Sequence, residues 1–264
     1  MEELAELDKS FKHVMFYEKD HSYKIDGVTA NYSATRLLKK YQKPFDAQMI
    51  GTMVARKRGI TLQTLLAEWD FTREYASYRG TEFHKFAENY LLRKWTSIDK
   101  DGIKNFLDKN KGDQTIGDYY NSFAVMVKNF KAFYDWWKED HILVKPEFVV
   151  GDKESSVCGT LDNLSYNTKT KKLAIFDYKT NKNLKLKGSK YGKLLAPFEH
   201  LPNNDLVKYS LQLHIYKHII EKHTKYTIDD LYIVWVCGEE GHELIECLDL
   251  SNDADLMMQR TIFG

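Results

Sequence analysis

An aspartate and a lysine stand two residues apart at the end of an apolar run, Leu173-Ala-Ile-Phe-Asp-Tyr-Lys-Thr180. If this run is a β-strand, the side chains of Asp177 and Lys179 point to the same face of a sheet. A carboxylate beside an ammonium group can bind a divalent cation and orient a water molecule. The same pair is also a common surface ion pair at a strand end, so it does not predict an enzyme by itself.

Two further carboxylates stand in apolar runs that come before this one. Asp162 closes the run Gly159-Thr-Leu-Asp162, and Glu147 opens an earlier run that ends at Gly151. A hairpin joining the two later runs would bring Asp162 close to Asp177, and the glycine would permit close approach of another group. Carboxylates gathered in this way repel one another unless a cation joins them. The three acids therefore predict a site for divalent cations.

Helical segments supply the remaining candidate side chains. His84 and Glu88 lie four residues apart on one face of a predicted amphipathic helix. His84 is a candidate nitrogen ligand, and Glu88 is a rival to Glu147 as the additional acid. Gln212 and Tyr216 lie one turn apart on an otherwise apolar helix, so they need polar partners if they are buried. A histidine that binds no metal would produce the first pattern. An exposed helix face would produce the second.

Lysines gather around the aspartate of the third apolar run. Between Asn163 and Ala196, Asp177 is the only acidic residue. A basic stretch around one carboxylate suits contact with a phosphate backbone, although a solvated lysine-rich loop has the same composition. The candidate DNA contacts are Lys182, Lys185, Lys187, Lys190 and Lys193.

Periodicity and turn signals predict the elements that position these residues. We expect a hairpin over 14–32 that turns at Asp26-Gly27, a helix from the cap Ser33 to Tyr41, and a helix over 47–58 that ends at Gly59. Helices follow over 61–95 and 117–139, strands over 147–151, 157–166 and 173–179, a polar loop over 181–205, a helix over 206–222, strands over 231–237 and 242–250, and a helix from 252. This order predicts an α/β fold with a small mixed central sheet flanked by helices.

Taken together and in order, five motifs resemble the RecB-like branch of the PD-(D/E)XK nuclease superfamily. That branch has a G-x-x-x-H helix, a glutamate strand, a G-x-x-D strand, a D-x-K-T strand and a Q-x-x-x-Y helix. They match Gly80-Thr-Glu-Phe-His84, Glu147, Gly159-Thr-Leu-Asp162, Asp177-Tyr-Lys-Thr180 and Gln212-Leu-His-Ile-Tyr216. The segments His21-Ser-Tyr, Asn31-Tyr-Ser-Ala-Thr35 and Phe45-Asp46 are also similar to phage-type and mitochondrial genome maintenance exonucleases. The resemblance covers about residues 16–237.

The resemblance implies a restriction-endonuclease-like nuclease core over residues 141–264, to which the helix of His84 also belongs. It implies that residues 1–140 form an N-terminal hairpin and helical region that arches over the active site. The expected activity is that of a DNA exonuclease in replication, recombination or repair, with two Mg²⁺ or Mn²⁺ ions. A structure-specific or RNA-directed endonuclease and a non-catalytic nucleic-acid-binding module remain alternatives.

The resemblance also implies a role for each motif residue. His84, Asp162, Asp177 and the backbone carbonyl of Tyr178 would bind the metal ions, and Glu147 would hold or orient them. Lys179 would position and deprotonate the attacking water or neutralise developing charge. Gln212 and Tyr216 would hold Lys179 or a phosphate.

Composition limits the other possibilities. Of the 264 residues, 43% are hydrophobic and 29% are charged, as in ordinary globular proteins. The cysteines Cys158, Cys237 and Cys247 form no C-x-x-C pair, so we expect small buried residues in a reducing compartment and no iron–sulfur cluster.

The expected setting follows from other absences. There is no phosphate-loop motif, so unwinding would come from a partner such as a helicase, or a single-strand annealing or binding protein. The sequence contains no apolar run of about 18 residues, so we expect no transmembrane helix and no contact with a membrane. Because residues 1–6 are acidic, unlike the start of a signal peptide, we expect a cytoplasmic location.

Overall fold

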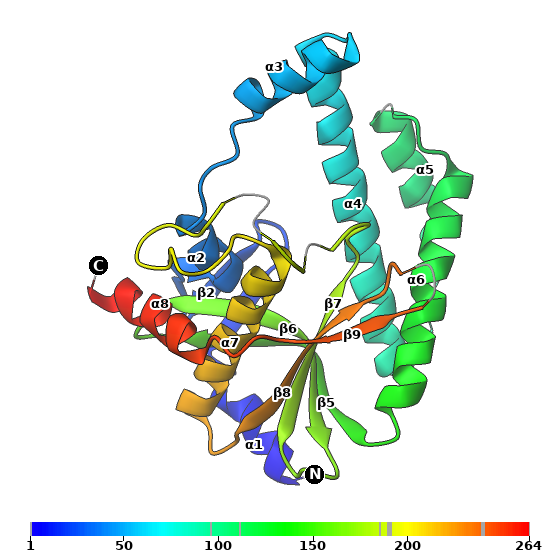
Figure 1. Ribbon diagram of the computed structural model, residues 1–264. Coiled ribbons are helices and arrows are strands. Elements are labelled where there is room, and N and C mark those ends of the chain that lie inside the picture. Colours follow the sequence, from blue (N-terminus) through cyan, green and yellow to red (C-terminus); the bar gives the residue numbers. More distant parts are fainter. Residues whose placement is uncertain are drawn as a thin grey trace.

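The computed structural model describes residues 2–95, 97–110, 112–184, 186–188, 192–238 and 241–263. In these residues helices flank a mixed sheet on both faces, so the chain has the predicted α/β fold (Figure 1). In chain order the elements are α1 (Glu2–Ser10), β1 (Val14–Tyr17), β2 (Ser22–Ile25), β3 (Val28–Thr29), β4 (Tyr32–Ser33), α2 (Ala34–Lys40), α3 (Ala47–Arg58), α4 (Leu62–Leu91), α5 (Lys100–Lys109), α6 (Ile116–Trp137), β5 (His141–Asp152), β6 (Val157–Asn167), β7 (Leu173–Lys179), α7 (Asp205–His223), β8 (Ile228–Trp235), β9 (Glu243–Glu246) and α8 (Ser251–Phe263).

The central sheet places β7 between a hairpin partner and a parallel neighbour. Strands β5 and β6 are antiparallel, as are β6 and β7, whereas β8 runs parallel to β7 and β9 returns antiparallel to β8. The sheet order is β4-β6-β7-β8-β9, and β5 also pairs with β6. The predicted hairpin between the second and third strands of the core is therefore confirmed.

One edge of β6 is only partly paired. Because β5 pairs with β6 along its whole length, β4 and β7 share the other edge, opposite residues 157–158 and 163–166 respectively. Within the described strands, residues 159–162 have no ladder partner on that edge. This interruption contains Gly159 and Asp162, and it allows side chains of neighbouring elements to approach the strand.

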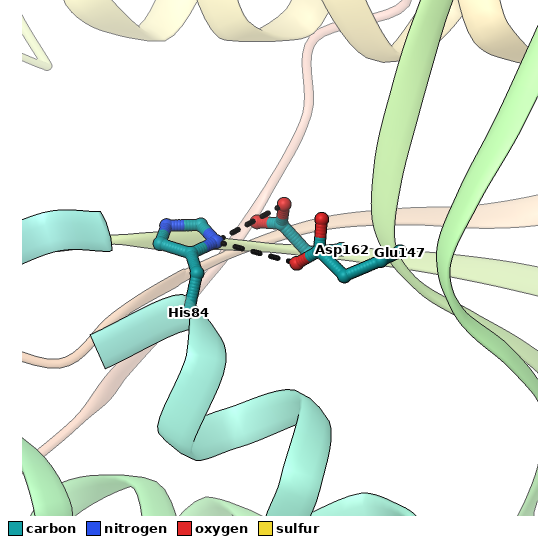
Figure 2. A group of neighbouring side chains, drawn as sticks. All are labelled: His84, Glu147 and Asp162. Carbon is teal, nitrogen blue, oxygen red and sulfur yellow. Dashed lines mark ion pairs between the residues drawn. The ribbon is translucent and has the colours of Figure 1, made fainter. Parts of the chain in front are cut away.

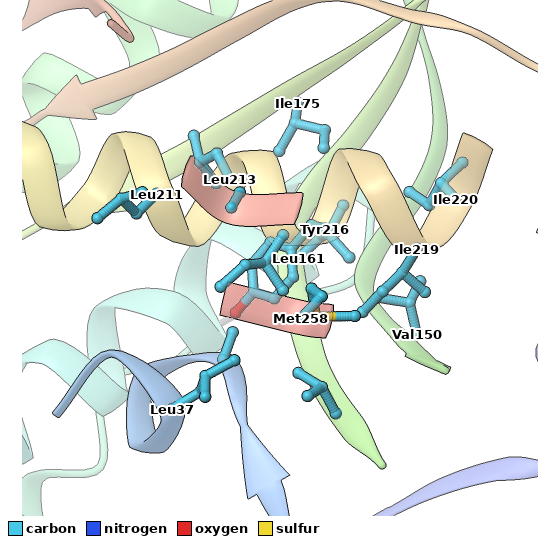
Figure 3. Packing of buried hydrophobic residues seen from close by; sticks show 14 of the residues in the cluster. Leu37, Val150, Leu161, Ile175, Leu211, Leu213, Tyr216, Ile219, Ile220 and Met258 are labelled. Atoms are coloured by element: carbon cyan, nitrogen blue, oxygen red, sulfur yellow. The ribbon is translucent and has the colours of Figure 1, made fainter. Parts of the chain in front are cut away.

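Alternating residues of β7 enter two hydrophobic cores. Ile175 belongs to the core cluster on one face of the sheet to which α2, α7 and α8 also contribute, and Figure 3 shows part of this cluster. Ala174 and Phe176 pack with α4 and α6 on the other face. By the same alternation, Asp177 points to the face that α7 covers. The buried Leu7, of α1, belongs to the first core.

The predicted helix ends and the N-terminal turn are confirmed. Ser33 caps α2, where its side chain accepts a hydrogen bond from the backbone N–H of Arg36. Gly59 ends α3 in the left-handed conformation, with φ of 68°. The turn at Asp26-Gly27 joins β2 to β3, and β1 extends this hairpin to a three-stranded sheet among the described residues.

Several elements differ from the sequence-based expectation, among them α1, which was not predicted. Strand β5 begins at His141, six residues before the expected Glu147, because it pairs with β6 through a bulge between Leu143 and Lys145. Helix α5 was not predicted, although Ile103, Phe106 and Leu107 recur at helical spacing within it. The division of the chain near residue 140 stays a prediction.

Two further expectations concern the burial of the cysteines and the presence of membrane-spanning helices. Cys158 is buried as predicted, whereas Cys237 and Cys247 are only half-buried. Across the described residues, no helix has both the length and the apolar character needed to cross a membrane.

The end of β5 is tied to the end of α7 by a buried aspartate. Asp152 accepts hydrogen bonds from the backbone N–H and the hydroxyl of Ser155 at 2.8 and 2.6 Å. Nζ of Lys222 and Nε2 of His223 each lie 2.8 Å from Oδ1 of Asp152. Burial alone would raise the pKa of Asp152, but Lys222 and the Ser155 hydrogen bonds hold it well below the ordinary value of 3.8.

Asp152 should make the stability of the protein depend on pH in the acid range. A carboxyl group whose pKa is lowered by folding stabilises the native state above its unfolded pKa, and this contribution is lost as pH falls. We expect Asp152→Asn to lower the free energy of unfolding at pH 7 by about 2–3 kcal/mol. Below pH 3.8 the difference from the wild type should shrink. Urea unfolding over a pH series measures it, and a difference that does not change with pH would contradict the prediction.

Candidate metal centre

Three predicted site residues from three different elements lie together. Nδ1 of His84, on α4, is 3.3 Å from Oδ1 of Asp162, on β6, and 3.8 Å from Oε1 of Glu147, on β5 (Figure 2). One ligand atom of each residue lies within 4.8 Å of the other two. The side chains of His84 and Glu147 keep 30% and 33% of their exposure, so the cluster is open to solvent.

Glu147 reaches the cluster from an unusual backbone conformation. Its φ is 44°, in the left-handed region that residues other than glycine rarely adopt. Pro146 and Phe148 pair with Asn163 and Leu161, so Glu147 stands opposite Asp162. Such a conformation costs about 1–3 kcal/mol and persists only where the surrounding structure holds it. The rival acid Glu88 is not a member of the cluster, although its charge raises the pKa of Glu147.

Asp162 links the cluster to the D-x-K strand. Its Oδ2 accepts a hydrogen bond of 2.7 Å from the backbone N–H of Tyr178, while Oδ1 faces His84. Because Asn163 pairs with Phe176, the next positions along the two strands are Asp162 and Asp177. The hairpin therefore places the second and third acids side by side, as the sequence predicted.

Asp177 and Lys179 form an ion pair beside the cluster. Their side chains are 3% and 14% exposed, and Nζ of Lys179 contacts Oδ2 of Asp177. Nζ also lies 4.3 Å from the ring centre of Tyr209, on α7. Asp177 is not one of the three residues whose ligand atoms gather within 4.8 Å. In this arrangement its carboxylate holds the lysine, and the two groups partly neutralise each other.

The acidic side chains perturb one another. Burial raises the pKa of Glu147, and burial with the charge of Asp162 raises that of Asp177 to about 6, against the opposing effect of Lys179. Burial acts in the same direction on Asp162, but His84, Lys179 and the Tyr178 N–H lower its pKa below the ordinary value. Positive charge from His84 and Lys179 therefore opposes the effect of burial on these carboxyl groups.

For the basic side chains of the site, burial lowers the pKa and the neighbouring carboxylates raise it. Burial would lower the pKa of His84, yet Asp162 and Glu147 together raise it to about 10. Burial likewise opposes the charge on Lys179, but Asp177 raises its pKa above the ordinary value. Both side chains therefore carry a proton at neutral pH when no other cation is bound.

Gln212 and Tyr216 are partners of each other. Nε2 of Gln212 donates a hydrogen bond of 2.8 Å to Oη of Tyr216, which is buried. No hydrogen bond joins Gln212 to Lys179 in the described part of the chain, so the expected support of the lysine is not seen. Tyr209 lies against Lys179 instead, and the sequence reasoning missed it. Its position three residues before Gln212, on the same face of α7, is a signal that could have found it.

Tyr216 requires the glycine of the G-x-x-D motif. A Cβ atom on Gly159 would lie 2.1 Å from the Tyr216 ring, at the unpaired edge of β6. The ring thus packs directly on the strand backbone, three residues before Asp162. This contact leaves no room for a side chain at position 159, and it places Tyr216 next to the strand that carries Asp162.

Gly159→Ala should destabilise the protein, because the tyrosine ring or the strand must move. We expect the free energy of unfolding to fall by about 1–3 kcal/mol in denaturant titrations. Gly117→Ala is the matched control, because a Cβ there meets its nearest atom at an ordinary 3.5 Å on helix α6. Equal stability of the two variants would show that Tyr216 does not constrain the strand.

The predicted DNA contacts are only partly described. Lys182, Lys187 and Lys193 are exposed on the segment between β7 and α7. Lys185 and Lys190 lie outside the described residues. Contact of this segment with DNA stays a prediction.

Comparison with protein-family models and with curated proteins found no match for this chain.

Proposed function

We propose that the chain is a divalent-metal-dependent DNA exonuclease of the PD-(D/E)XK type. The observation that carries the proposal is the meeting of His84, Glu147 and Asp162 next to the buried pair Asp177 and Lys179. These residues come from four elements, and they match the motifs in the order that the resemblance requires.

The donor set fits hard divalent cations. Carboxylate oxygens are the ligands that Mg²⁺ and Mn²⁺ prefer, and imidazole is a common nitrogen ligand. His84, Asp162, Asp177 and the carbonyl of Tyr178 would hold two ions, with Glu147 holding or orienting them. His84 would lose its proton on ligation. When bound, such ions neutralise the phosphate, activate water and stabilise the leaving oxygen.

Lys179 would act on the reacting phosphate rather than on the metals. Because Asp177 raises its pKa, the ammonium group is protonated at neutral pH. It would position and deprotonate the attacking water, or neutralise developing charge. Asp177 and the ring of Tyr209 would hold the ammonium group in place.

The fold supports the same proposal at a coarser level. Helix α4, strands β5 to β7, helix α7 and strand β8 follow one another in the order expected for a restriction-endonuclease-like core. Helix α3 and the first half of α4 project away from the sheet, as an arch over the site would (Figure 1). The exposed Arg56 and Lys57 at the end of α3 would meet the phosphates of a strand guided beneath it. A helicase or a single-strand annealing or binding protein would supply the DNA end.

The test uses end-labelled linear DNA and closed circular single-stranded DNA, each with Mg²⁺ or Mn²⁺ and with a chelator. An exonuclease releases label from the linear DNA, leaves the circle intact and stops when the metal is removed. Cleavage of the circle would assign an endonuclease of the same chemistry. Binding of both DNAs without cleavage under any metal would overturn the catalytic proposal in favour of a binding module.

A further inference from the structure

A cavity of about 710 Å³ lies next to the candidate metal centre but shares none of its residues. Its lining residues come from α4, from α6 and the segment before it, from the carboxyl end of β8, and from the residues that follow the parallel strands β7 and β8. Ligands of α/β proteins commonly bind at such strand ends, and this volume suits a small organic ligand. Its wall includes Phe71, Tyr75, Arg79, Val125, Lys182 and Trp235.

Aromatic rings form one part of the wall. Phe71 and Tyr75, one turn apart on α4, stack with centroids 5.9 Å apart and planes at 23°. Trp235, at the end of β8, donates a hydrogen bond of 2.7 Å from Nε1 to the carbonyl of Asn181, which holds the indole in place. The half-buried rings of Phe71 and Trp235 are flat surfaces of the kind that can stack on a nucleobase of any sequence, whereas Tyr75 is buried and Arg79 lies over its ring.

Two cations form another part of the wall. Arg79 donates a hydrogen bond of 3.1 Å from Nη2 to the carbonyl of Thr180, and Lys182 is exposed two residues later. Among the described residues, no carboxylate forms an ion pair with either side chain. Asp113 and Gln114, which precede α6, add polar groups to the cavity. The cavity thus combines stacking surfaces, positive charge that no described carboxylate neutralises, and hydrogen-bonding groups.

Two residues that line the cavity form hydrogen bonds to the residue that follows β7. The carbonyl of Thr180, next in sequence to Lys179, accepts hydrogen bonds from Arg79 and from Sγ of Cys237, the latter at 3.2 Å. Both donors line the cavity. A ligand held by Arg79 would therefore lie close to the backbone that positions Lys179.

We propose that this cavity is a subsite for one nucleotide, with the base against the aromatic rings and the phosphate against Arg79 and Lys182. The choice of a nucleotide rests on the proposed nuclease function, because the strand being cut and its product are then at hand. The occupant is a nucleoside 5′-monophosphate unit, either the free product or a residue of the bound strand. Binding in the cavity needs no metal ion.

The test is calorimetric titration of the whole protein in the presence of a chelator, with deoxyadenosine 5′-monophosphate and, separately, with a short single-stranded oligonucleotide. Ala76→Trp fills the cavity from an exposed position of α4, and Ala132→Trp is the same change at an exposed position of α6 outside it. We expect Ala76→Trp to weaken binding of at least one of the two ligands by about tenfold or more, while Ala132→Trp does not.

A second pair of variants tests whether Ala76→Trp weakens binding by occupying the cavity rather than by disturbing the fold. Trp235→Leu removes a stacking ring and should weaken the same ligand, whereas Trp95→Leu removes a tryptophan that is 91% exposed and should not. Weakening for the mononucleotide identifies the free product as occupant, and weakening for the oligonucleotide alone identifies a strand residue.

Equal affinity of Ala76→Trp and the wild type for both ligands would overturn the subsite. Metal-dependent cleavage would then still support the nuclease proposal. Conversely, nucleotide binding that Ala76→Trp weakens, in a protein that cleaves no DNA under any metal, would keep the subsite and overturn the nuclease.

Discussion

Asp177→Asn is expected to slow metal-dependent DNA cleavage by about a thousandfold or more. The substitution keeps the size of the side chain but removes the charge that pairs with Lys179 and would bind a cation. The ammonium group then loses its partner, and the metal centre loses an anionic oxygen. The measurement is the initial rate of label release from linear DNA at saturating Mg²⁺, with circular dichroism to establish that the variant is folded.

Asp229→Asn is the matched control for this variant. Asp229 lies at the opposite end of the β7–β8 pair, where it forms an exposed ion pair of 2.9 Å with Lys172. The same chemical change there should leave the rate within about twofold of the wild type, because exposed ion pairs contribute little. If Asp177→Asn cleaved DNA as fast as Asp229→Asn, the assignment of Asp177 and Lys179 to the active site would be wrong.

Metal binding should stabilise the protein as well as activate it. At a Mn²⁺ concentration one hundredfold above Kd, we expect the melting temperature to rise by about 5–10 °C. The cause is relief of the repulsion among Glu147, Asp162 and Asp177, which burial intensifies. A chelator should reverse the shift and abolish cleavage. Thermal unfolding followed by circular dichroism over a Mn²⁺ series measures the effect.

Glutamine substitutions at the two rival acids test where the metal binds. Glu147→Gln should shrink the Mn²⁺-dependent shift to less than half, because Glu147 belongs to the cluster with His84 and Asp162. Glu88→Gln, four residues after His84 on α4, should leave most of it. The reverse result would transfer the role of additional acid to Glu88. A wild-type protein whose melting temperature did not respond to Mn²⁺ would have no metal centre of this kind.

Much of the site could be read from local patterns. The two-residue spacing of Asp177 and Lys179 placed both on one face of a strand, and the structure pairs them there. The hairpin expected between the two later apolar runs sets Asp162 beside Asp177. Such predictions succeed because the direction of a side chain in a strand follows from the backbone of that strand alone.

Other features depended on packing that no local pattern encodes. Glu147 has a left-handed backbone and its carboxylate lies beside His84, an arrangement that depends on how β5, β6 and α4 pack together. Lys179 lies against Tyr209 rather than bonding to Gln212, because the orientation of α7 on the sheet selects which of its residues reaches the lysine. Helix α5 escaped prediction because it is only ten residues long, and a helix of that length depends on packing such as that of Ile103 in the core shared with α4 and α6.

The sequence by itself determined the α/β class, the order of the core elements and the set of acids, histidine and lysine that could do chemistry. Periodicity and turn residues carry that information, since they act within a few positions of one another. Only the tertiary structure decided that Glu147 and not Glu88 lies with His84, that Tyr216 packs on Gly159, and that a cavity opens between α4 and α6. These outcomes depend on register, bulges and helix placement, which arise from contacts between residues far apart in the chain.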